Sequence, residues 1–395
     1  MKKIIVVVIA LCSTFCLMSQ TMKSSVYYLA SEKCEGRLMN TRGDTLAREY
    51  IAKTFKDIGL KPLFKDFFQD VRLSKAGKDS VFSANVVAVC KGSDPLLRDE
   101  YIVIGSHFDH LGKGKNIYGR STDTMGIYFG ADDNASGVAM MLETAKRFAK
   151  HPSKRSVIFV AFSAEEMGLV GSQFFVEHLP AKVKITAMLN FDMVGKLHGG
   201  HLNVGGSQTS SEAEQIVNQF AQMYNLKIQF SPSGMGPSDH ASFYAKSIPV
   251  FFIYTSADST YHTHNDKPEY IDYEGMETIS DFAFALASNI ADRANNLTFQ
   301  QTKDPERTVS KMRISLGIMP DHTGTTAGVK VQAVSKGKAA EKAGIKVGDL
   351  IIAIGNQDIK DLYQYMDALS AFKKGDQTKI TVIRNNEKII LNTEF

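Results

Sequence analysis

The sequence predicts an α/β fold: a mostly parallel central sheet with helices on both faces, followed by a small β-rich domain. From about residue 84 to 295, short β-branched runs alternate with helical patterns, as a parallel sheet with crossover helices requires. At 395 residues the chain exceeds what one hydrophobic core usually organises. Residues 296–311 are polar and lack periodicity. We therefore expect one domain at 20–295, a linker at 296–311 and a second domain at 312–395.

The N-terminus has the layout of a signal peptide. Lys2 precedes an apolar run from Ile4 to Cys12, and small polar residues follow around Ser19, which is typical of secretory signals. The run is interrupted too soon to span a bilayer, which takes about 20 residues. We therefore expect residues 1–19 to be a signal peptide and the chain to be exported, either to the periplasm or as a secreted protein, without an integral membrane span.

The four cysteines fall into two pairs. Cys12 and Cys16 lie within the predicted signal, and the tripeptides before them are poor lipoprotein cleavage sites, so release is favoured over a lipid anchor. Cys34 and Cys90 stay in the mature chain. Whether these two form a disulfide is open, because sequence positions alone say nothing about the geometry that a disulfide needs.

The charge pattern excludes one class of partner. The chain has 46 basic and 42 acidic residues, for a formal net charge of +4. No basic stretch is interleaved with aromatic residues, as a nucleic-acid groove requires. We therefore do not expect nucleic acid to be a partner.

Periodicity places the main elements of the first domain. Residues 43–58 read as an amphipathic helix stopped by Gly59. Residues 135–149 carry an apolar stripe at helical spacing, which is core packing. The predicted strands are 85–90, 101–105, 157–162, 185–190 and 249–254.

The first candidate site residues follow the second of these strands. His107 and Asp109 lie two residues apart at its end, so on an extended chain they face the same side. Asp109 could accept the second N–H of the imidazole and fix the ring orientation that a metal ligand needs. The alternative is a histidine that caps the strand end.

Acidic residues follow at three further points. Asp132 and Asp133 lie on a Gly-flanked turn before a helix, where a solvated turn is the alternative. Glu165 and Glu166 follow a buried strand, where surface charge is the alternative. Because neighbouring side chains on a loop point in different directions, Glu166 could bind a metal while Glu165 acts as a base. Asp192 follows the next strand.

These residues should converge, because parallel folds gather their sites at the carboxyl ends of strands. The loop after the last strand adds His262 and His264. Two nitrogens and three carboxylates suit two zinc ions that share one bridging carboxylate. The expected ligands are His107, Asp132, Glu166, Asp192 and one histidine of that last loop.

Taken together, the motifs resemble the co-catalytic di-zinc aminopeptidases of metallopeptidase family 28. The resemblance spans about residues 26–295 and occurs in the family's order. It includes Glu35-Gly36-Arg37 near its start. The matching motifs are His107-Phe108-Asp109, Gly130 to Gly137, Ser163 to Glu166, Asn190 to Met193 and Tyr261-His262-Thr263.

The resemblance implies a role for each residue. Asp132 would bridge two zinc ions, with His107 and Asp192 on one ion and Glu166 and His262 on the other. His262 is selected over His264 because the family's ligand precedes a Thr and lies four residues before an Asp. Glu165 would be the general acid/base that removes a proton from the attacking water, with Asp109 supporting the site. The family also implies a cis peptide between Asp132 and Asp133.

Two further segments extend the resemblance. The loop ending in Ser238-Asp239-His240 is similar to a family segment near the substrate pocket, so His240 is expected to contact substrate, with a loop-fixing hydrogen bond as the alternative. The segments 315–318, 339–345 and 348–351 resemble a PDZ domain of the bacterial protease type. That resemblance implies that 315–318 captures a peptide or protein C-terminus and that the helix 361–372 lines the groove. A domain that only packs on the first is the alternative.

The sequence thus predicts an exported zinc-dependent exopeptidase, an aminopeptidase with two zinc ions, acting on peptides. A related zinc carboxypeptidase or dipeptidase, or a glutaminyl cyclase, is one alternative. Arg120 is the main basic residue near the motifs that could bind a substrate carboxylate. A noncatalytic PDZ-containing binding protein is the alternative of another class, which the complete set of ligands and base disfavours.

Overall fold

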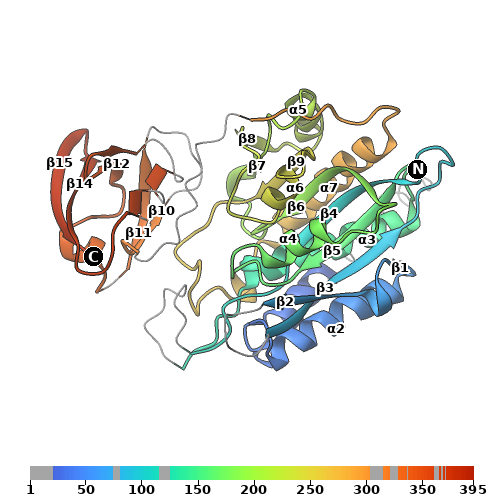
Figure 1. Cartoon of the computed structure of the whole chain (residues 1–395), viewed down its shortest axis with the longest axis horizontal. Helices are drawn as coiled ribbons and strands as arrows, with labels where there is room; N and C mark the ends of the chain where they lie inside the picture. The colour runs from blue at the N-terminus through green and yellow to red at the C-terminus, as the bar shows by residue number, and fades with distance from the viewer. Residues whose placement is uncertain are drawn as a thin grey trace, which may run out of the picture. The chain divides into compact units, whose positions relative to one another are not determined.

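The chain folds into two compact units, one formed by Met1–Ser256 and Thr260–Thr302 and the other by Ala257–Ser259 and Lys303–Phe395. The computed structural model describes residues 21–73, 81–114, 125–302, 315–320, 328–335, 337–359, 364–365, 368–369 and 371–395. Figure 1 labels their helices and strands. The predicted signal peptide, Arg120 and most of the predicted linker lie outside these ranges. Within them, no helix is long and apolar enough to cross a membrane.

Among the described residues, nine strands form the central sheet of the first unit. The strands in the middle of this sheet are parallel, as predicted. Strand β4 (Glu100–His107) pairs in parallel with β5 (Ser156–Phe162) and with β6 (Lys184–Phe191), and β6 pairs in parallel with β9 (Val250–Tyr254). All four strands run through predicted positions. Their parallel alignment puts their carboxyl ends at one edge, where the candidate site residues follow them.

The flanks of this sheet are mixed, with antiparallel pairs and one parallel pair, β7 with β8. The remaining predicted strand, 85–90, corresponds to β3 (Val81–Cys90), which is antiparallel to β5. It also pairs with two short antiparallel strands, β1 and β2. On the other side β7 is antiparallel to β9. The remaining flanking strands are β1 (Lys61–Pro62), β2 (Phe68–Leu73), β7 (His201–Gly205) and β8 (Lys227–Ser231).

Helices cover both faces of the sheet, because alternate side chains of a strand point to opposite faces. Ile102 and Ile104 of β4 pack in the larger core with α2, α3, α5 and α7. Tyr101 and Val103 pack in the opposite core with α4 and α6. The helices are α2 (Arg42–Asp57), α3 (Gly137–Lys150), α4 (Val170–Glu177), α5 (Ala213–Met223), α6 (His240–Tyr244) and α7 (Tyr273–Asp292).

Local sequence explains the ends of the two predicted helices. The side chain of Thr41 accepts a hydrogen bond from the backbone N–H of Asp44 and so caps α2. Gly59 follows this helix with a φ of +83°, a conformation that glycine adopts without strain. Helix α3 continues directly from the irregular turn Ala131–Ser136. Short 3₁₀ segments occur at η1 (Glu32–Cys34), η2 (Lys65–Phe67), η4 (His198–Gly200) and η5 (Pro268–Tyr270).

The second unit is a small antiparallel sheet with its own core. The strand order is β10-β11-β12-β14-β15, with β13 paired to β12. Leu316, Ile351 and Val382 are among the buried residues of its core. Within the predicted groove helix 361–372, Tyr365 and Leu369 are described and buried. The elements are β10 (Ile318–Pro320), β11 (Val329–Val334), α8 (Ala339–Ala343), β12 (Leu350–Ile354), β13 (Gln357–Asp358), β14 (Gln377–Arg384) and β15 (Glu387–Glu394).

The cysteine question is answered within the first unit. Cys34 and Cys90 are both buried free thiols rather than a disulfide. Burial raises the pKa of each thiol, so neither is an activated nucleophile.

Candidate metal centre

The carboxyl edge of the sheet brings together side chains from five segments of the first unit. His107 is the last residue of β4, and Asp192 directly follows β6. Asp133 lies on the turn before α3. Glu166 comes from the loop after β5, and His262 from the loop after β9. The convergence expected of a parallel fold is therefore present.

Two groups of potential metal ligands meet at Asp133. In the first, Nε2 of His107 lies 3.3 Å from Oδ1 of Asp133 and 3.3 Å from Oδ1 of Asp192. In the second, Nε2 of His262 lies 3.0 Å from Oδ2 of Asp133 and 3.3 Å from Oε1 of Glu166. Each oxygen of Asp133 thus belongs to a different group, which is the arrangement of a bridging carboxylate.

The spacing and chemistry of these donors fit zinc. A tetrahedral site with bonds of about 2.0–2.2 Å has about 3.3–3.6 Å between its ligand atoms. The four distances above, 3.0 to 3.3 Å, are close to that range. Burial opposes a positive charge on His107, but Asp192 and Glu165 outweigh it and raise the pKa of this histidine well above its usual value. The surroundings therefore favour positive charge, which metal ions would supply.

Asp132, the expected bridge, is turned away from both groups, and this corrects the prediction. Its Oδ1 accepts hydrogen bonds from the backbone N–H of Gly195, at 2.8 Å, and from Oγ of Ser136, at 3.1 Å. Burial, and then the charge of Asp266, raise the pKa of Asp132 to about 7. The cis peptide is likewise found one residue later than expected, between Asp133 and Asn134.

A carboxylate outside the predicted ligand set fixes this turn. Both oxygens of Asp266 accept the backbone N–H of Asp132, at 3.0 and 3.1 Å, and Oδ2 also accepts that of Asp133, at 3.0 Å. Asp266 is the residue four positions after His262 that helped to select this histidine. Its contacts give that spacing a physical reason, because they tie the loop carrying His262 to the turn carrying Asp133.

Asp109 contacts His107, which it was expected to orient, and also the backbone of the loop after β5. Its carboxylate lies 3.7 Å from Nδ1 of His107, and that nitrogen also lies 3.2 Å from the backbone carbonyl of Asp109. Its two oxygens accept the backbone N–H groups of Glu165, at 3.0 Å, and Glu166, at 3.3 Å. Asp109 therefore links the loop after β4 to the two acidic residues after β5.

Glu165 has the environment of a proton-transfer group. Burial raises the pKa of this carboxyl well above its usual value, and the nearby charges of Glu166, Asp239 and Asp192 raise it further, against the lowering effect of His107. A carboxyl with a raised pKa can exchange a proton near neutral pH. It belongs to neither ligand group, so its side chain is available for that task.

The other predicted histidines belong to neither ligand group. His240 is buried and stacked on Phe252, with ring centroids 4.3 Å apart, and burial lowers its pKa to about 3. Substrate contact by His240 stays a prediction. The ring of His264 packs edge-on against Tyr128, at 4.2 Å, and belongs to neither group.

Tyr261 and His110 are site residues that sequence reasoning missed. The ring of Tyr261 stacks on His262 at 3.9 Å. Burial, followed by the charges of Asp133 and Glu166, raises its pKa, so the hydroxyl keeps its proton and can donate a hydrogen bond. His110 joins the group of Asp133, Glu166 and His262. Its position three residues after His107 on one loop was the available signal.

Arg37 gives the early Glu-Gly-Arg motif a structural role. Its fully buried guanidinium donates to four backbone carbonyls: Nε to Phe108, at 2.7 Å, Nη1 to Leu29 and Phe129, at 2.6 and 2.8 Å, and Nη2 to Gly130, at 2.8 Å. Phe108 adjoins His107, and Gly130 begins the turn of Asp133. Arg37 therefore joins the two loops that supply these ligands.

Comparison with protein families places the site in a known context. The family model described as peptidase family M28 matches residues 85–287, about half of the chain. The chain belongs to peptidase family M28. A PDZ domain model matches residues 298–395, so the second unit is a PDZ domain. The M28 match covers β3 to α7 and includes each ligand of both groups.

Curated relatives of this M28 chain are named as proteases and aminopeptidases. Leupeptin-inactivating enzyme 1 of Streptomyces exfoliatus is 34% identical over 181 residues, covering 45% of this chain and 36% of that protein. Aminopeptidase YwaD of Bacillus subtilis is 31% identical over 175 residues, covering 40% and 36%. The chain thus spans little more than a third of the length of these relatives.

Solved structures share the fold of the first unit. An aminopeptidase from Aneurinibacillus sp. strain AM-1 matches with a TM-score of 0.56 and 18% identity, covering 73% of this chain and 98% of that one. A glutaminyl cyclase of Bacteroides thetaiotaomicron matches with a TM-score of 0.57 and 16% identity, covering 69% and 97%. The same fold therefore occurs in an aminopeptidase and in a glutaminyl cyclase, and the residues of the site have to distinguish the two.

Proposed function

We propose that this chain is a zinc-dependent exopeptidase that releases N-terminal residues from peptides. The observation that carries the proposal is Asp133, whose two oxygens belong to two separate groups of zinc-type ligands, with Glu165 beside them. Family membership and the names of the relatives support peptide hydrolysis. Two metal positions support a peptidase over a cyclase, which would need one zinc.

The proposed division of ligands follows the distances. His107 and Asp192 would hold one zinc ion, Glu166 and His262 the other, and Asp133 would bridge them in place of Asp132. Bound zinc would supply Lewis acidity, which polarises a peptide carbonyl and makes a nearby water easier to deprotonate. Asp109 would hold His107 and the two glutamates in position relative to one another through the contacts described above.

Glu165 would perform the proton transfers. Its carboxylate would take the proton of the attacking water and then give it to the nitrogen of the peptide bond. The nitrogen would then leave as a neutral amine when the C–N bond breaks. Burial, together with the negative charge of the neighbouring carboxylates, keeps the pKa of Glu165 high, which favours the return of the proton. The protonated hydroxyl of Tyr261 would donate a hydrogen bond to the carbonyl oxygen as negative charge develops there.

We further propose that the protein is exported and that its PDZ domain binds the C-terminus of a peptide or protein. The basis for export is the N-terminal sequence. At the expected carboxylate loop, the carbonyls of Leu316 and Gly317 accept the N–H groups of Ala340 and Ser335, both at 2.8 Å. Gly317 has a φ of +83°. These bonds fix the loop, as backbone capture of a carboxylate requires.

A substrate panel tests the proposed reaction. Aminoacyl and dipeptide substrates are supplied with free and blocked N-termini, together with N-terminal glutamine peptides and C-terminal reporter peptides. We expect hydrolysis only from free N-termini, loss of activity after chelation and recovery with zinc. Cleavage of N-blocked substrates alone would indicate a carboxypeptidase, and cyclisation of glutamine would indicate a cyclase. No turnover with fully reloaded metal would favour a noncatalytic binding protein.

A further inference from the structure

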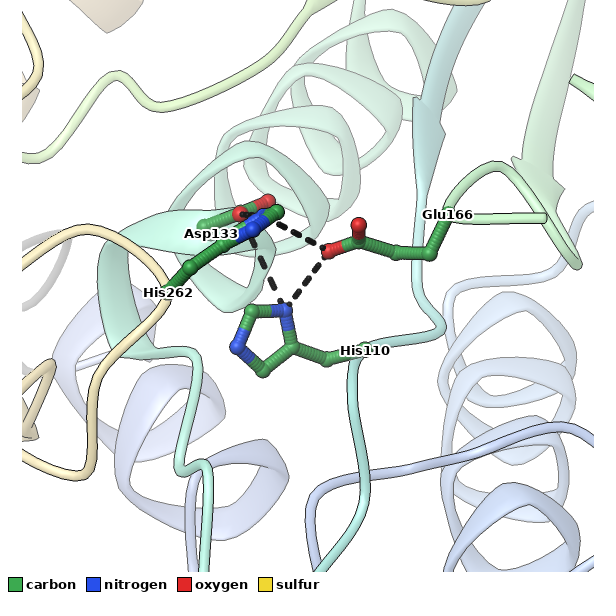
Figure 2. Close-up of side chains that lie close together, drawn as sticks. All are labelled: His110, Asp133, Glu166 and His262. Carbon is green, nitrogen blue, oxygen red and sulfur yellow. Dashed lines mark hydrogen bonds and ion pairs between the residues drawn. The ribbon is translucent and has the colours of Figure 1, made fainter. Parts of the chain in front are cut away.

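We infer that His110 is an additional metal ligand and that it makes the two metal positions unequal. This inference rests on the metal site of the proposed function but not on the peptidase reaction. Figure 2 shows His110, Asp133, Glu166 and His262 with their polar ends directed toward one another. Nδ1 of His110 lies 2.9 Å from Oε1 of Glu166 and 3.7 Å from Oδ2 of Asp133.

These distances complete a set of four donors. One atom each from His110, Asp133, Glu166 and His262 lies within 4.8 Å of the other three. The four measured separations in this group are 2.9, 3.0, 3.3 and 3.7 Å. They scatter around the roughly 3.3–3.6 Å expected between ligands of a tetrahedral zinc ion. The other group, formed by His107, Asp133 and Asp192, has three donors and a single nitrogen.

The protein holds the His110 ring in this place. The ring is fully buried and packs edge-on against Tyr128, at 6.5 Å, and His262, at 5.7 Å. A Cβ at Gly130 would lie only 2.6 Å from Cδ2 of His110, so the glycine leaves room for the imidazole. The backbone N–H of His110 also bonds the carbonyl of Arg37, at 3.4 Å.

The consequence is an order of metal binding. A site with four protein ligands and two imidazoles resembles a closed structural zinc site, whereas three ligands leave a position open. The group containing His110 should therefore fill first and exchange slowly. The group containing His107 should fill second and lose its ion first to a chelator.

The competing role for His110 is a hydrogen bond to Glu166 with no metal contact. His110→Asn distinguishes the two roles, because its side-chain amide N–H can occupy nearly the position of Nδ1 and still donate to Glu166. It cannot offer an imidazole lone pair. His110→Ala removes both interactions. His151→Ala is the matched control, because His151 is exposed and follows the end of α3 opposite the turn of Asp133.

Zinc binding to the full-length metal-free protein is measured by competition with a chromophoric chelator, and circular dichroism checks the fold of each variant. We expect two affinities in the parent protein. His110→Asn and His110→Ala should both weaken the tighter one by at least about 10–100-fold, with the weaker one changed by less than about threefold. One equivalent of cobalt should give a visible spectrum that changes in both variants and not in His151→Ala.

Three outcomes would overturn the inference. These are equal affinities in the parent protein, an unchanged tight site in His110→Asn, or loss confined to the weaker site. If His110→Ala fails to fold, His110→Asn still decides the question. Because these readings use metal binding alone, a protein that binds metal in this order yet hydrolyses no peptide would refute the proposed function and leave the His110 assignment intact.

Discussion

Replacing Arg37 with methionine tests whether this one side chain stabilises the ligand loops. The substitution keeps most of the side-chain volume but removes four hydrogen bonds from a buried guanidinium to the backbone. Hydrogen bonds of a charged group contribute about 1.5–3 kcal/mol each, so four give an upper bound of about 6–12 kcal/mol. Desolvation of the buried charge offsets several kcal/mol of this sum. We therefore expect a loss of about 3–5 kcal/mol in the free energy of unfolding.

Urea denaturation provides the assay. The chain has no tryptophan, so far-UV circular dichroism follows the helix-rich first unit. With a slope of about 3 kcal/mol/M for a domain of this size, the midpoint should fall by about 1–1.7 M. Arg42→Met, at an exposed position near the start of α2, is the control and should change stability by less than about 0.5 kcal/mol.

Arg37→Lys separates the geometry of the guanidinium from its charge. A lysine keeps the charge but cannot reach carbonyls in four directions, so it should recover only part of the lost stability. Zinc affinity should fall in Arg37→Met, since the loops carrying His107 and Asp133 lose their common contact. A loss below about 1 kcal/mol with unchanged zinc affinity would refute the reasoning.

Three further predictions concern individual carboxylates. Glu165→Gln should keep fold and zinc content while turnover falls by about 10²–10⁴-fold, and retained turnover would contradict its role as the base. Asp133→Asn should lower zinc content at both positions, measured by atomic emission, whereas Asp132→Asn should leave it intact; the reverse would restore Asp132 as the bridge. Burial raises the pKa of Asp44 from 3.8 to about 6, so its folded form holds the proton more tightly and stability falls as pH rises between these values, by about 3 kcal/mol. Asp44→Asn should lack this fall in stability. If the free energy of unfolding of parent and variant changes in parallel with pH, the prediction for Asp44 is wrong.

The sequence was sufficient for the fold class because the central strands are short, largely apolar runs that contain β-branched residues. β4, β5, β6 and β9 were found on that signal, and their parallel order then predicted a site at one edge. The flanking strands were missed for a physical reason. β7 and β8 are five residues each and carry few β-branched residues, so their pairing depends on neighbours that the local sequence does not reveal.

Two errors at the site came from the path of the backbone. Asp132 and Asp133 are chemically identical neighbours, and the sequence does not reveal the path of their turn, whose two N–H groups Asp266 binds from a loop far along the chain. His110 was missed because extended geometry was assumed beyond His107. β4 ends at His107 and His110 lies beyond it, so the alternation of a strand no longer predicts which side chains share a face.

The contacts of Asp266 also bear on how this protein could be re-engineered. Residue 266 belongs to the loop after β9, yet its carboxylate is a structural part of the turn before α3. A chimera that exchanges the loop after β9 to alter substrate preference would therefore also alter the support of Asp133. Graft boundaries should keep Asp266 with the recipient turn, or transfer the two segments together, because in the folded protein they form a single module assembled from distant parts of the chain.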